Sequence, residues 1–371
     1  MSRSGAKAMD LAALRRHHLA LVFDHLLEQG PASRASLALT TGLAKASVSS
    51  LVADLLDRGL VSELDVRMNG RRGRPATDIV VESRSVSGLG LEINVDYVAA
   101  SVVDLGGETR LTFRRERDNR DRPSRAVFTD ARRLARKSLA ASQQARILCI
   151  GATLALPGLV DPATASVIVA PNLHWLDFSG DARTHLRLPA GLPVRCDNEA
   201  NLAALAELRF GIGRSCPSFV YLSPGIGIGA GVVADGRLAR GAHGFAGEIG
   251  HIVVDPTGPL CGCGARGCLE AVAGPSTSDD LTAEALTVAL RSVVLVLDPE
   301  AVVLGGRFAR ADLAAAVEDQ LVRRTLGGER HRCRVVPATF GHEAALVGGA
   351  TAALADVIAD PTVVPLGFRA G

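Results

Sequence analysis

The sequence predicts a mixed α/β protein in which a small helical N-terminal domain precedes a larger α/β body. Three observations lead to this prediction. Apolar residues recur at helical spacing over residues 9–58, a loop rich in arginine and glycine follows, and strand-like and helix-like segments alternate from residue 89 onward. With 371 residues, 47% of them hydrophobic, the chain is long enough for two or three domains and too apolar to be disordered.

Charge and cysteine content narrow the class of protein. The formal net charge is +2, and residues 1–87 hold 12 basic and 9 acidic side chains, so the basic excess lies at the N-terminal end. The chain does not begin with an apolar signal segment and no apolar run reaches membrane-spanning length, so we expect a cytoplasmic protein that does not contact membranes. The cysteine count is odd, and Cys149 and Cys196 lie in apolar, strand-like runs, which indicates reduced thiols.

The N-terminal segment has the pattern of a helix-turn-helix. We expect helices over residues 9–29, 33–40 and 45–58, with Gly30-Pro31 ending the first and Thr41-Gly42-Leu43 forming the turn before the third. Small or basic side chains at the start of the third helix suit contacts to phosphates and base edges. The candidate DNA-binding residues on this helix are Lys45, Ser47, Ser49 and Ser50.

A basic loop follows that pattern. A strand opens at residues 59–61, and residues 67–79 form an arginine-rich, glycine-containing loop before a return strand, as in a wing. The arginines that we expect on phosphates or in a narrow minor groove are Arg71, Arg72 and Arg74. The alternative is a solvated loop that joins two helical domains. We favour a winged helix-turn-helix domain over residues 1–82 that binds double-stranded DNA, with residues 83–87 as a linker.

The body is predicted to consist of two α/β halves with glycine-rich turns where the halves face each other. In the first half we expect strands at 89–93, 98–104, 111–115, 147–154, 167–170 and 194–196 and a helix at 124–141. In the second half we expect strands at 218–223, 229–234, 252–254 and 301–304, helices at 281–297 and 311–324, and a closing helix at 344–358.

One histidine and three cysteines predict a metal site in the second half. The candidate ligands are His251, Cys261, Cys263 and Cys268. Three thiolates and an imidazole complete a tetrahedral shell for zinc and leave no position for a reactive water, so we expect one structural Zn²⁺ per chain. Glycines between the ligands would allow the tight turns, at Gly262, Gly264 and Gly267. The alternative is a set of loose thiols.

The body resembles the ROK family (repressors, open reading frames and sugar kinases), whose members have a two-lobed actin-like ATPase fold. The resemblance is carried by Leu156-Pro157-Gly158 and by residues 171–175, 197–207, 225–231, 247–270 and 302–306. With the winged domain in front, the chain resembles the repressor branch. Residues 88–371 would then form an effector-binding domain that contains a zinc loop at 251–268. Only 27 residues separate Glu270 from Asp298, fewer than is usual in the family, which leaves open a deletion in this segment.

The resemblance also indicates which catalytic elements are changed. The early phosphate-binding turn, Asp-x-Gly-x-Thr in the kinases, is Glu92-Ile93-Asn94-Val95-Asp96 here, without the glycine and the threonine. In the second turn, usually Gly-Thr-Gly, Pro224 removes a backbone donor. The catalytic aspartate aligns with Glu199, whose carboxylate lies one methylene further out. We therefore expect the chain not to be an enzyme.

The sugar pocket, by contrast, is implied to be retained. The residues that would bind hydroxyl groups are Asn172, Asn198, Glu199, Glu248, His251 and Glu270. His251 would serve twice, with one ring nitrogen on zinc and the other toward the sugar. The alternatives are an exposed helix face for Glu199 and Glu207, and support of the metal loop for Glu248 and Glu270.

Together these features predict a DNA-binding transcriptional regulator, a repressor of carbohydrate-metabolism genes that responds to a sugar or a sugar phosphate. A homodimer or homotetramer would place two recognition helices on a near-palindromic operator. One alternative is an ATP-dependent sugar kinase with a DNA-binding head, which the changed phosphate turns disfavour. Another is a constitutive architectural DNA-binding protein with a vestigial pocket, which the intact polar set disfavours.

Overall fold

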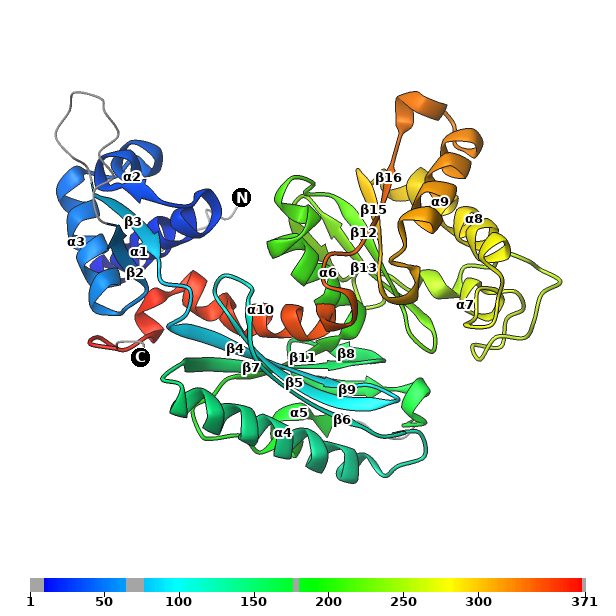
Figure 1. Ribbon diagram of the computed structural model, residues 1–371, viewed down its shortest axis with the longest axis horizontal. Coiled ribbons are helices and arrows are strands. Elements are labelled where there is room, and N and C mark those ends of the chain that lie inside the picture. The colour runs from blue at the N-terminus through cyan, green and yellow to red at the C-terminus, as the bar shows by residue number, and fades with distance from the viewer. Residues whose placement is uncertain (1–9, 65–76, 176–179, 369–371) are drawn as a thin grey trace, which may run out of the picture.

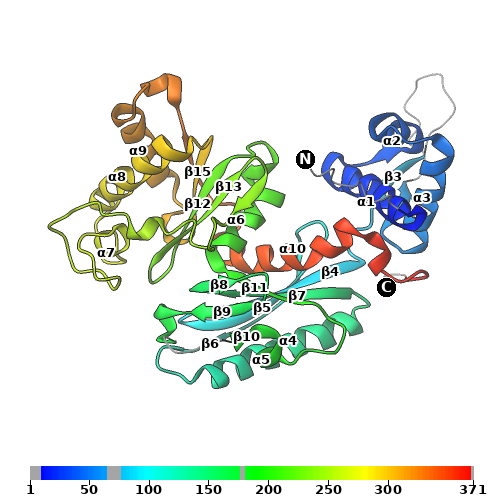
Figure 2. The same ribbon diagram turned by 180° about the vertical axis from the view of Figure 1, so that it is seen from behind.

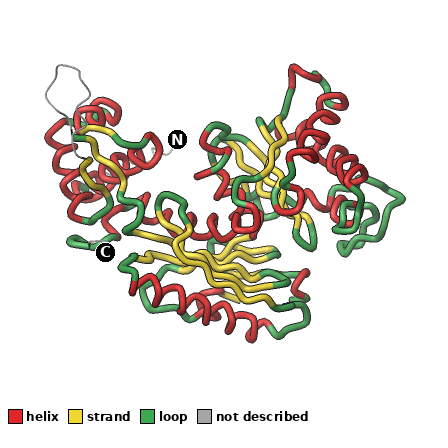
Figure 3. Tube along the Cα trace, in the orientation of Figure 1, coloured by secondary structure: helices red, strands yellow, loops and turns green. Residues whose placement is uncertain are grey.

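The protein folds into a head and two lobes. The structure is a computed structural model that describes residues 10–64, 77–175 and 180–368. Helix α10 (Ala344–Ala359) runs through the middle of the molecule, with lobe one on one side of it and the head and lobe two on the other (Figures 1 and 2). Strands form one layer in each lobe, flanked by helices (Figure 3).

The head is a winged helix-turn-helix, as predicted. Its helices are α1 (Leu11–Gln29), α2 (Arg34–Thr41) and α3 (Lys45–Asp57), and its strands are β1 (Ala32–Ser33), β2 (Val61–Leu64) and β3 (Asp78–Val81), in the order β1-β3-β2. Ser33 Oγ caps α2 by accepting a hydrogen bond from Ser36 N (3.2 Å), and Gly42 ends this helix in a left-handed conformation (φ 72°). Helices α2 and α3 are bent by 116° relative to each other, an angle typical of this motif. The loop with Arg71, Arg72 and Arg74 lies outside the described residues.

The predicted linker at residues 83–87 is wrong, because the segment is part of the packed structure. Strand β4 already begins at Val86, and the buried Ser85 donates its hydroxyl to the carbonyl oxygen of Gly59 in the head (2.7 Å). Head and body also share one hydrophobic core. That core includes Leu19, Val22, Phe23 and Ile79 of the head and Val86, Leu105, Leu354, Val357 and Val364 of the body.

The C-terminal strap, residues 361–368, holds the end of α3. The side chain of Arg58, which follows α3, is only 9% exposed. Its Nη1 donates to the carbonyl oxygens of Thr362 (3.0 Å) and Val364, and its Nε donates to Asp54 Oδ1 (2.7 Å). A buried guanidinium is stable only when its donors are satisfied, so Arg58 ties the strap to α3.

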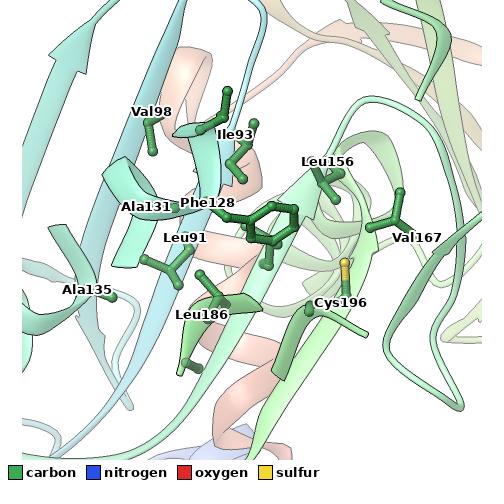
Figure 4. Packing of buried hydrophobic residues seen from close by; sticks show 14 of the residues in the cluster. Leu91, Ile93, Val98, Phe128, Ala131, Ala135, Leu156, Val167, Leu186 and Cys196 are labelled. Atoms are coloured by element: carbon green, nitrogen blue, oxygen red, sulfur yellow. The ribbon is translucent and has the colours of Figure 1, made fainter. Parts of the chain in front are cut away.

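Lobe one is built on a five-stranded sheet of order β11-β7-β4-β5-β6. Its strands are β4 (Val86–Ile93), β5 (Tyr97–Asp104), β6 (Thr109–Glu116), β7 (Leu148–Leu156) and β11 (Val194–Asn198). Helices α4 (Ser124–Gln144) and α5 (Ala182–Leu186) lie on one face and α10 on the other. Phe128 of α4 packs among Leu91, Leu156 and Leu186 in the core (Figure 4). Strands β8 (Leu159–Asp161), β9 (Ser166–Val169) and β10 (Gly180–Asp181) form a small side sheet.

Lobe two repeats this topology in the order β14-β13-β12-β15-β16. Its strands are β12 (Phe219–Pro224), β13 (Ile228–Ala234), β14 (Arg237–Ala239), β15 (Ala301–Leu304) and β16 (Arg334–Pro337), and its helices are α6 (Glu199–Phe210), α7 (Leu269–Val272), α8 (Asp279–Leu297) and α9 (Ala311–Arg324). In both lobes the two strand pairings on one side of the central strand, β4 or β12, are antiparallel, and the two pairings on its other side are parallel. The predicted two-lobed actin-like fold is thereby confirmed.

The main local errors of the sequence prediction lie in lobe two. Residues 252–254 were expected to form a strand, but they make only an isolated bridge, Val253 to Cys268, because this segment is folded into the cysteine loop. Helix α6 was considered only as an exposed helix face that carries Glu199 and Glu207. It is instead buried almost all round and lacks a polar stripe. Among the described residues no single helix is long and apolar enough to span a membrane; α2 and α3 pass that test only as a bent pair.

The strap makes a specific prediction about stability. Replacement of Arg58 by methionine should lower the free energy of unfolding by about 2–4 kcal/mol, because two buried carbonyl groups lose their charged donor. Arg34 is the matched control, since its ion pair with Glu63 is exposed and Arg34→Met should cost less than about 1 kcal/mol. Chemical unfolding of both variants measures the difference. Equal losses would contradict a strap held by Arg58.

Candidate functional site

Six predicted sugar-binding residues lie on four segments that converge between the lobes, and we call them the polar cluster. Asn172 is on η1 (Pro171–Leu173), Asn198 and Glu199 begin α6, Glu248 and His251 flank η3 (Ile249–His251), and Glu270 is on α7. The start of β13 is the common point. A β-carbon at Gly227 would lie 2.6 Å from Glu270 Oε2 and 3.6 Å from Asn172 Nδ2, and one at Gly229 would lie 3.7 Å from Glu199 Oε1.

His251 joins the polar cluster to the cysteine loop. Its Nε2 is 3.7 Å from Glu248 Oε2, and its Nδ1 is 3.5 Å from Glu270 Oε1 and 3.7 Å from Cys261 Sγ. Glu270 in turn accepts from Cys261 Sγ (3.1 Å) and from the backbone N–H of Ile228 (3.4 Å). One nitrogen of the ring therefore faces the thiols and the other faces Glu248, the arrangement that a dual role requires.

Asn198 has a strong structural role as well. Its Oδ1 accepts from the N–H groups of Ala200 (2.8 Å) and Asn201 (3.4 Å), which caps α6, and its Nδ2 donates to the carbonyl oxygen of Gly158 (3.0 Å). Only one amide hydrogen of this side chain is left for a ligand. Asn198 fixes the position of its neighbour Glu199 at the first turn of the helix.

Glu199 is the most perturbed acid in the polar cluster. Its Oε2 is buried without a hydrogen-bond partner. Burial is the main cause that raises the pKa of Glu199 to about 8, and the nearby carboxylates of Glu92, Glu248 and Asp197 add to it. The Glu199 carboxyl is therefore largely protonated at neutral pH.

Sequence reasoning missed the buried support behind the polar cluster. Asp197 accepts from Asn201 Nδ2 (3.2 Å) and forms an ion pair with Arg240. Glu207, for which an exposed helix face was the alternative, is instead fully buried and accepts from Thr339 N (2.5 Å). The pairing of Asp197 with Arg240 and that of Glu207 with Thr339 could not be found from sequence spacing, because the partners are 43 and 132 residues apart.

The four candidate metal ligands do come together. One ligand atom from each of His251, Cys261, Cys263 and Cys268 lies within 4.8 Å of all the others. Cys263 Sγ is 3.6 Å from Cys268 Sγ, close to the edge of about 3.8 Å in a tetrahedron with 2.3 Å metal–sulfur bonds. All seven cysteines are free thiols.

The glycines of this loop differ in importance. Gly264 and Gly267 have positive φ (92° and 65°), and a β-carbon at Gly267 would lie 1.5 Å from the carbonyl oxygen of Asp255. Gly262 has neither a positive φ nor a neighbour within 4 Å, so the expectation that it is needed for the fold is wrong. The donor set and these turns fit a tetrahedral divalent ion.

In the two segments that the resemblance aligns with the kinases' phosphate turns, backbone N–H groups donate within the segment itself. In the first, the backbone N–H of Val95 donates to Asn94 Oδ1 (2.7 Å), and the buried Glu92 accepts from Asn94 and Tyr97. In the second, the N–H of Gly225 donates to the carbonyl oxygen of Gly227 (2.8 Å). The backbone N–H groups of Val95 and Gly225 are therefore already used within the chain.

The candidate DNA surface lies at the start of α3. Its side chains are exposed at Lys45, Ser47, Ser49 and Ser50. Arg15 of α1, which sequence reasoning missed, donates its Nη1 to Ser50 Oγ (3.2 Å) and pairs with Asp54 (2.9 Å). It is half exposed and adds a cation beside the serine.

The pKa of Glu199 predicts how pH affects stability. Between about pH 4.5 and 8 the Glu199 carboxyl holds a proton in the folded chain but not in the unfolded chain. The folded state is therefore fully stabilised by the neutral carboxyl below pH 4.5. That contribution to the free energy of unfolding is lost as the pH rises to 8. Glu199→Gln should remove this loss and gain about 1–3 kcal/mol over wild type between pH 5 and 8. Chemical unfolding across that range measures the gain. A difference between the two proteins that does not change with pH would contradict the buried, protonated carboxyl.

Comparisons with known proteins agree with this fold. The ROK family model matches residues 88–278. The xylose repressor of Bacillus subtilis (strain 168) is 31% identical over 262 residues, which are 70% of this chain and 66% of that protein, slightly under two thirds of its length. A crystal structure of a ROK family transcriptional regulator, described as a homologue of the E. coli MLC protein, has a TM-score of 0.76 at 24% identity and covers 94% of this chain and 98% of its own. A ROK family glucokinase from Streptomyces griseus, solved with glucose and AMPPNP, has a TM-score of 0.59 at 27% identity and covers 72% and 98%. The family model spans more than half of the chain, and the chain therefore belongs to the ROK family.

Proposed function

We propose that the chain is a cytoplasmic DNA-binding transcriptional regulator, a repressor of carbohydrate-metabolism genes whose operator binding responds to a sugar or a sugar phosphate. The observation that carries this proposal is a winged helix-turn-helix that shares a hydrophobic core with a two-lobed body, in which six polar side chains converge. The similarity to a protein named xylose repressor supports it. The test is release of the chain from its own upstream DNA by a panel of monosaccharides and their phosphates.

The head would bind DNA through two elements. Helix α3 would enter the major groove with Lys45 and Ser47 toward the base edges, and the wing arginines would contact phosphates or the minor groove. We further propose a homodimer or homotetramer, since two copies would match a near-palindromic operator. Residues 1–82 would be the DNA-binding domain and residues 88–371 the effector-binding domain.

The polar cluster would bind the hydroxyl groups of the effector. Carboxylates and amides accept and donate in pairs, which suits neighbouring hydroxyls, and Asn172, Glu248 and Glu270 are open enough to take part. The glucokinase solved with glucose supports a monosaccharide as the ligand class. Sugar binding would change operator affinity only by as much as the sugar's own affinity differs between the two arrangements of head and lobes.

The signal has a short physical route to the head. Helix α6, which begins at Glu199, packs closely on α10, because a β-carbon at Gly348 would lie 1.7 Å from the carbonyl oxygen of Leu202. Helix α10 leads directly into the strap that holds α3. A movement of α6 would thus be passed through α10 to the recognition helix.

We propose that the domain does not phosphorylate sugars. The internal hydrogen bonds at Val95 and Gly225 would leave fewer backbone donors for phosphate, and the protonated Glu199 would not act as a general base at neutral pH. The alternative is an ATP-dependent sugar kinase with a DNA-binding head. Turnover near one per second with ATP and any hexose in the same panel would favour that alternative.

We propose one structural zinc ion per chain, held by His251 and the three loop cysteines. The ion would fix the loop that carries Glu248 and Glu270. It would therefore affect effector binding by holding these two side chains in place, and it would not contact the effector itself. A closed shell of four protein ligands leaves no site for a reactive water.

Metal analysis tests the zinc site. The purified chain should contain one zinc per chain, and Cys263→Ser should lose it, whereas Cys149→Ser, outside the ligand set, should keep it. Gly267→Ala should also lower zinc content because its β-carbon would collide with Asp255, and Gly262→Ala should not. Full zinc content in Cys263→Ser would refute the proposed ligand set.

Salt dependence tests the DNA interface. Alanine at Arg71, Arg72 and Arg74 should weaken binding to every sequence and reduce the salt slope by about one unit for each phosphate interaction that is removed. Ser47→Ala should instead change the preference among operator variants. Arg323→Ala, on the exposed face of α9, is the control and should change neither. A chain without residues 1–82 that still bound the operator would disprove the assignment.

A separation of function tests the switch. Glu248→Ala should bind the operator as wild type does but respond to sugar about 10- to 150-fold more weakly, the effect of removing one charge-assisted hydrogen bond of about 1.5–3 kcal/mol. Glu270→Ala should weaken the response to sugar similarly, and it should also remove the acceptor of the Cys261 thiol in the metal loop. Asp319→Ala on α9 is the exposed control. Normal release of both glutamate variants by the active sugar would mean that the effector binds elsewhere.

A further inference from the structure

A cavity lies away from the polar cluster, at the junction of the head, lobe one and lobe two. Its volume is about 1050 Å³, which is large enough for a drug-sized molecule. Its walls come from α1, from the turn after β5, from the end of α6 with the η2 turn (Ile212–Arg214), and from α10. Figures 1 and 2 show that α10 extends from the head to lobe two. The head, lobe one and lobe two all contribute residues to the lining of the cavity.

The walls of this junction cavity are largely apolar. Leu21 of α1, Leu208 and Phe210 of α6, and Ala352 and Ala355 of α10 line it. Leu21 is 39% exposed and Ala355 is exposed, although their helices also contribute buried residues to the shared core. Apolar surface that remains open in a concave site favours an apolar ligand.

The charged groups of the junction cavity cancel. Asp24 and Glu28 of α1 face Arg209 and Arg214. Arg209 Nη2 is 3.9 Å from Asp24 Oδ1 and its Nη1 is 3.8 Å from Glu28 Oε1, so these ion pairs are too long for direct hydrogen bonds. Arg209 Nη2 is also buried without a hydrogen-bond partner. The pairs leave donor and acceptor capacity unused on both sides.

We propose that the junction cavity binds an uncharged, largely apolar small molecule that carries a hydroxyl group, such as a hydroxylated two-ring aromatic compound. Because the carboxylates of Asp24 and Glu28 offset the guanidiniums of Arg209 and Arg214, neither an anion nor a cation gains a net Coulomb attraction that offsets the loss of its hydration. A hydroxyl can accept from a guanidinium and donate to a carboxylate at once, which neither a carboxylate nor an ammonium group can do. The rings would lie on the leucine, phenylalanine and alanine side chains.

Such a ligand would touch the head and both lobes together. It would therefore stabilise one arrangement of the three parts, by a route that does not use Glu248 or Glu270. This consequence for DNA binding depends on the proposed function, but the binding itself does not.

Calorimetric titration of the full chain with 2-naphthol, without DNA or sugar, tests the site. We expect saturable binding at one site per chain. Ala355→Trp on α10 and Leu21→Trp on α1 should each weaken binding at least about tenfold by filling the cavity, and Arg209→Leu should weaken it about tenfold without filling it. Ala315→Trp on the exposed face of α9 is the matched control and should bind as wild type does.

Charged analogues complete the test. The anion 2-naphthoate and the cation 2-naphthylmethylammonium should each bind at least about tenfold more weakly than 2-naphthol. Binding of 2-naphthol that does not saturate would overturn the proposal, as would equal binding by wild type and Ala355→Trp or naphthoate binding as tight as that of 2-naphthol. If Ala355→Trp does not fold, Leu21→Trp and Arg209→Leu decide the outcome.

Discussion

The hydrophobic core that the head shares with the body is the contact on which the rest of the structure depends. Leu354 and Val357 of α10 and Val364 of the strap are fully or almost fully buried against head residues such as Phe23. Each such side chain contributes about 1.5–3 kcal/mol by its removal from water, so the head is held to the body by more than a covalent link. The orientation of α3 is therefore a property of the whole molecule.

Close backbone contacts make α10 a rigid connection. A β-carbon at Gly88 would lie 2.1 Å from the carbonyl oxygen of Ala350, and one at Gly90 would lie 1.9 Å from that of Leu346, so α10 lies directly on β4. The same helix lies against α6, the helix that begins with Glu199. Since packed interiors do not deform continuously, a change at the polar cluster is expected to move these elements together.

Local chemistry could be read from the sequence, and long-range packing could not. The cysteine loop was predictable because its ligands lie within eighteen residues and their chemistry selects a metal. The turn at Gly42 was predictable from a short helix, a glycine and a longer helix. The shared core was not, because residues such as Val364 give no sign of their partners some 300 positions away, and this led to the wrong linker at residues 83–87. The roles of Asn198 as a cap and of Arg240 as partner of Asp197 likewise needed the folded chain.

Hydrogen exchange at increasing denaturant concentrations tests the central claim, that head and body form one cooperative unit, most directly. Amides of α1 and α3 and amides of α10 should open with the same free energy, within about 1 kcal/mol, in the intact chain. In Arg58→Met the opening free energies of α3 and of the strap should fall together, because the guanidinium joins them. A head that opened several kcal/mol more easily than α10 in the intact chain would contradict the account, since its core would then be independent of the body.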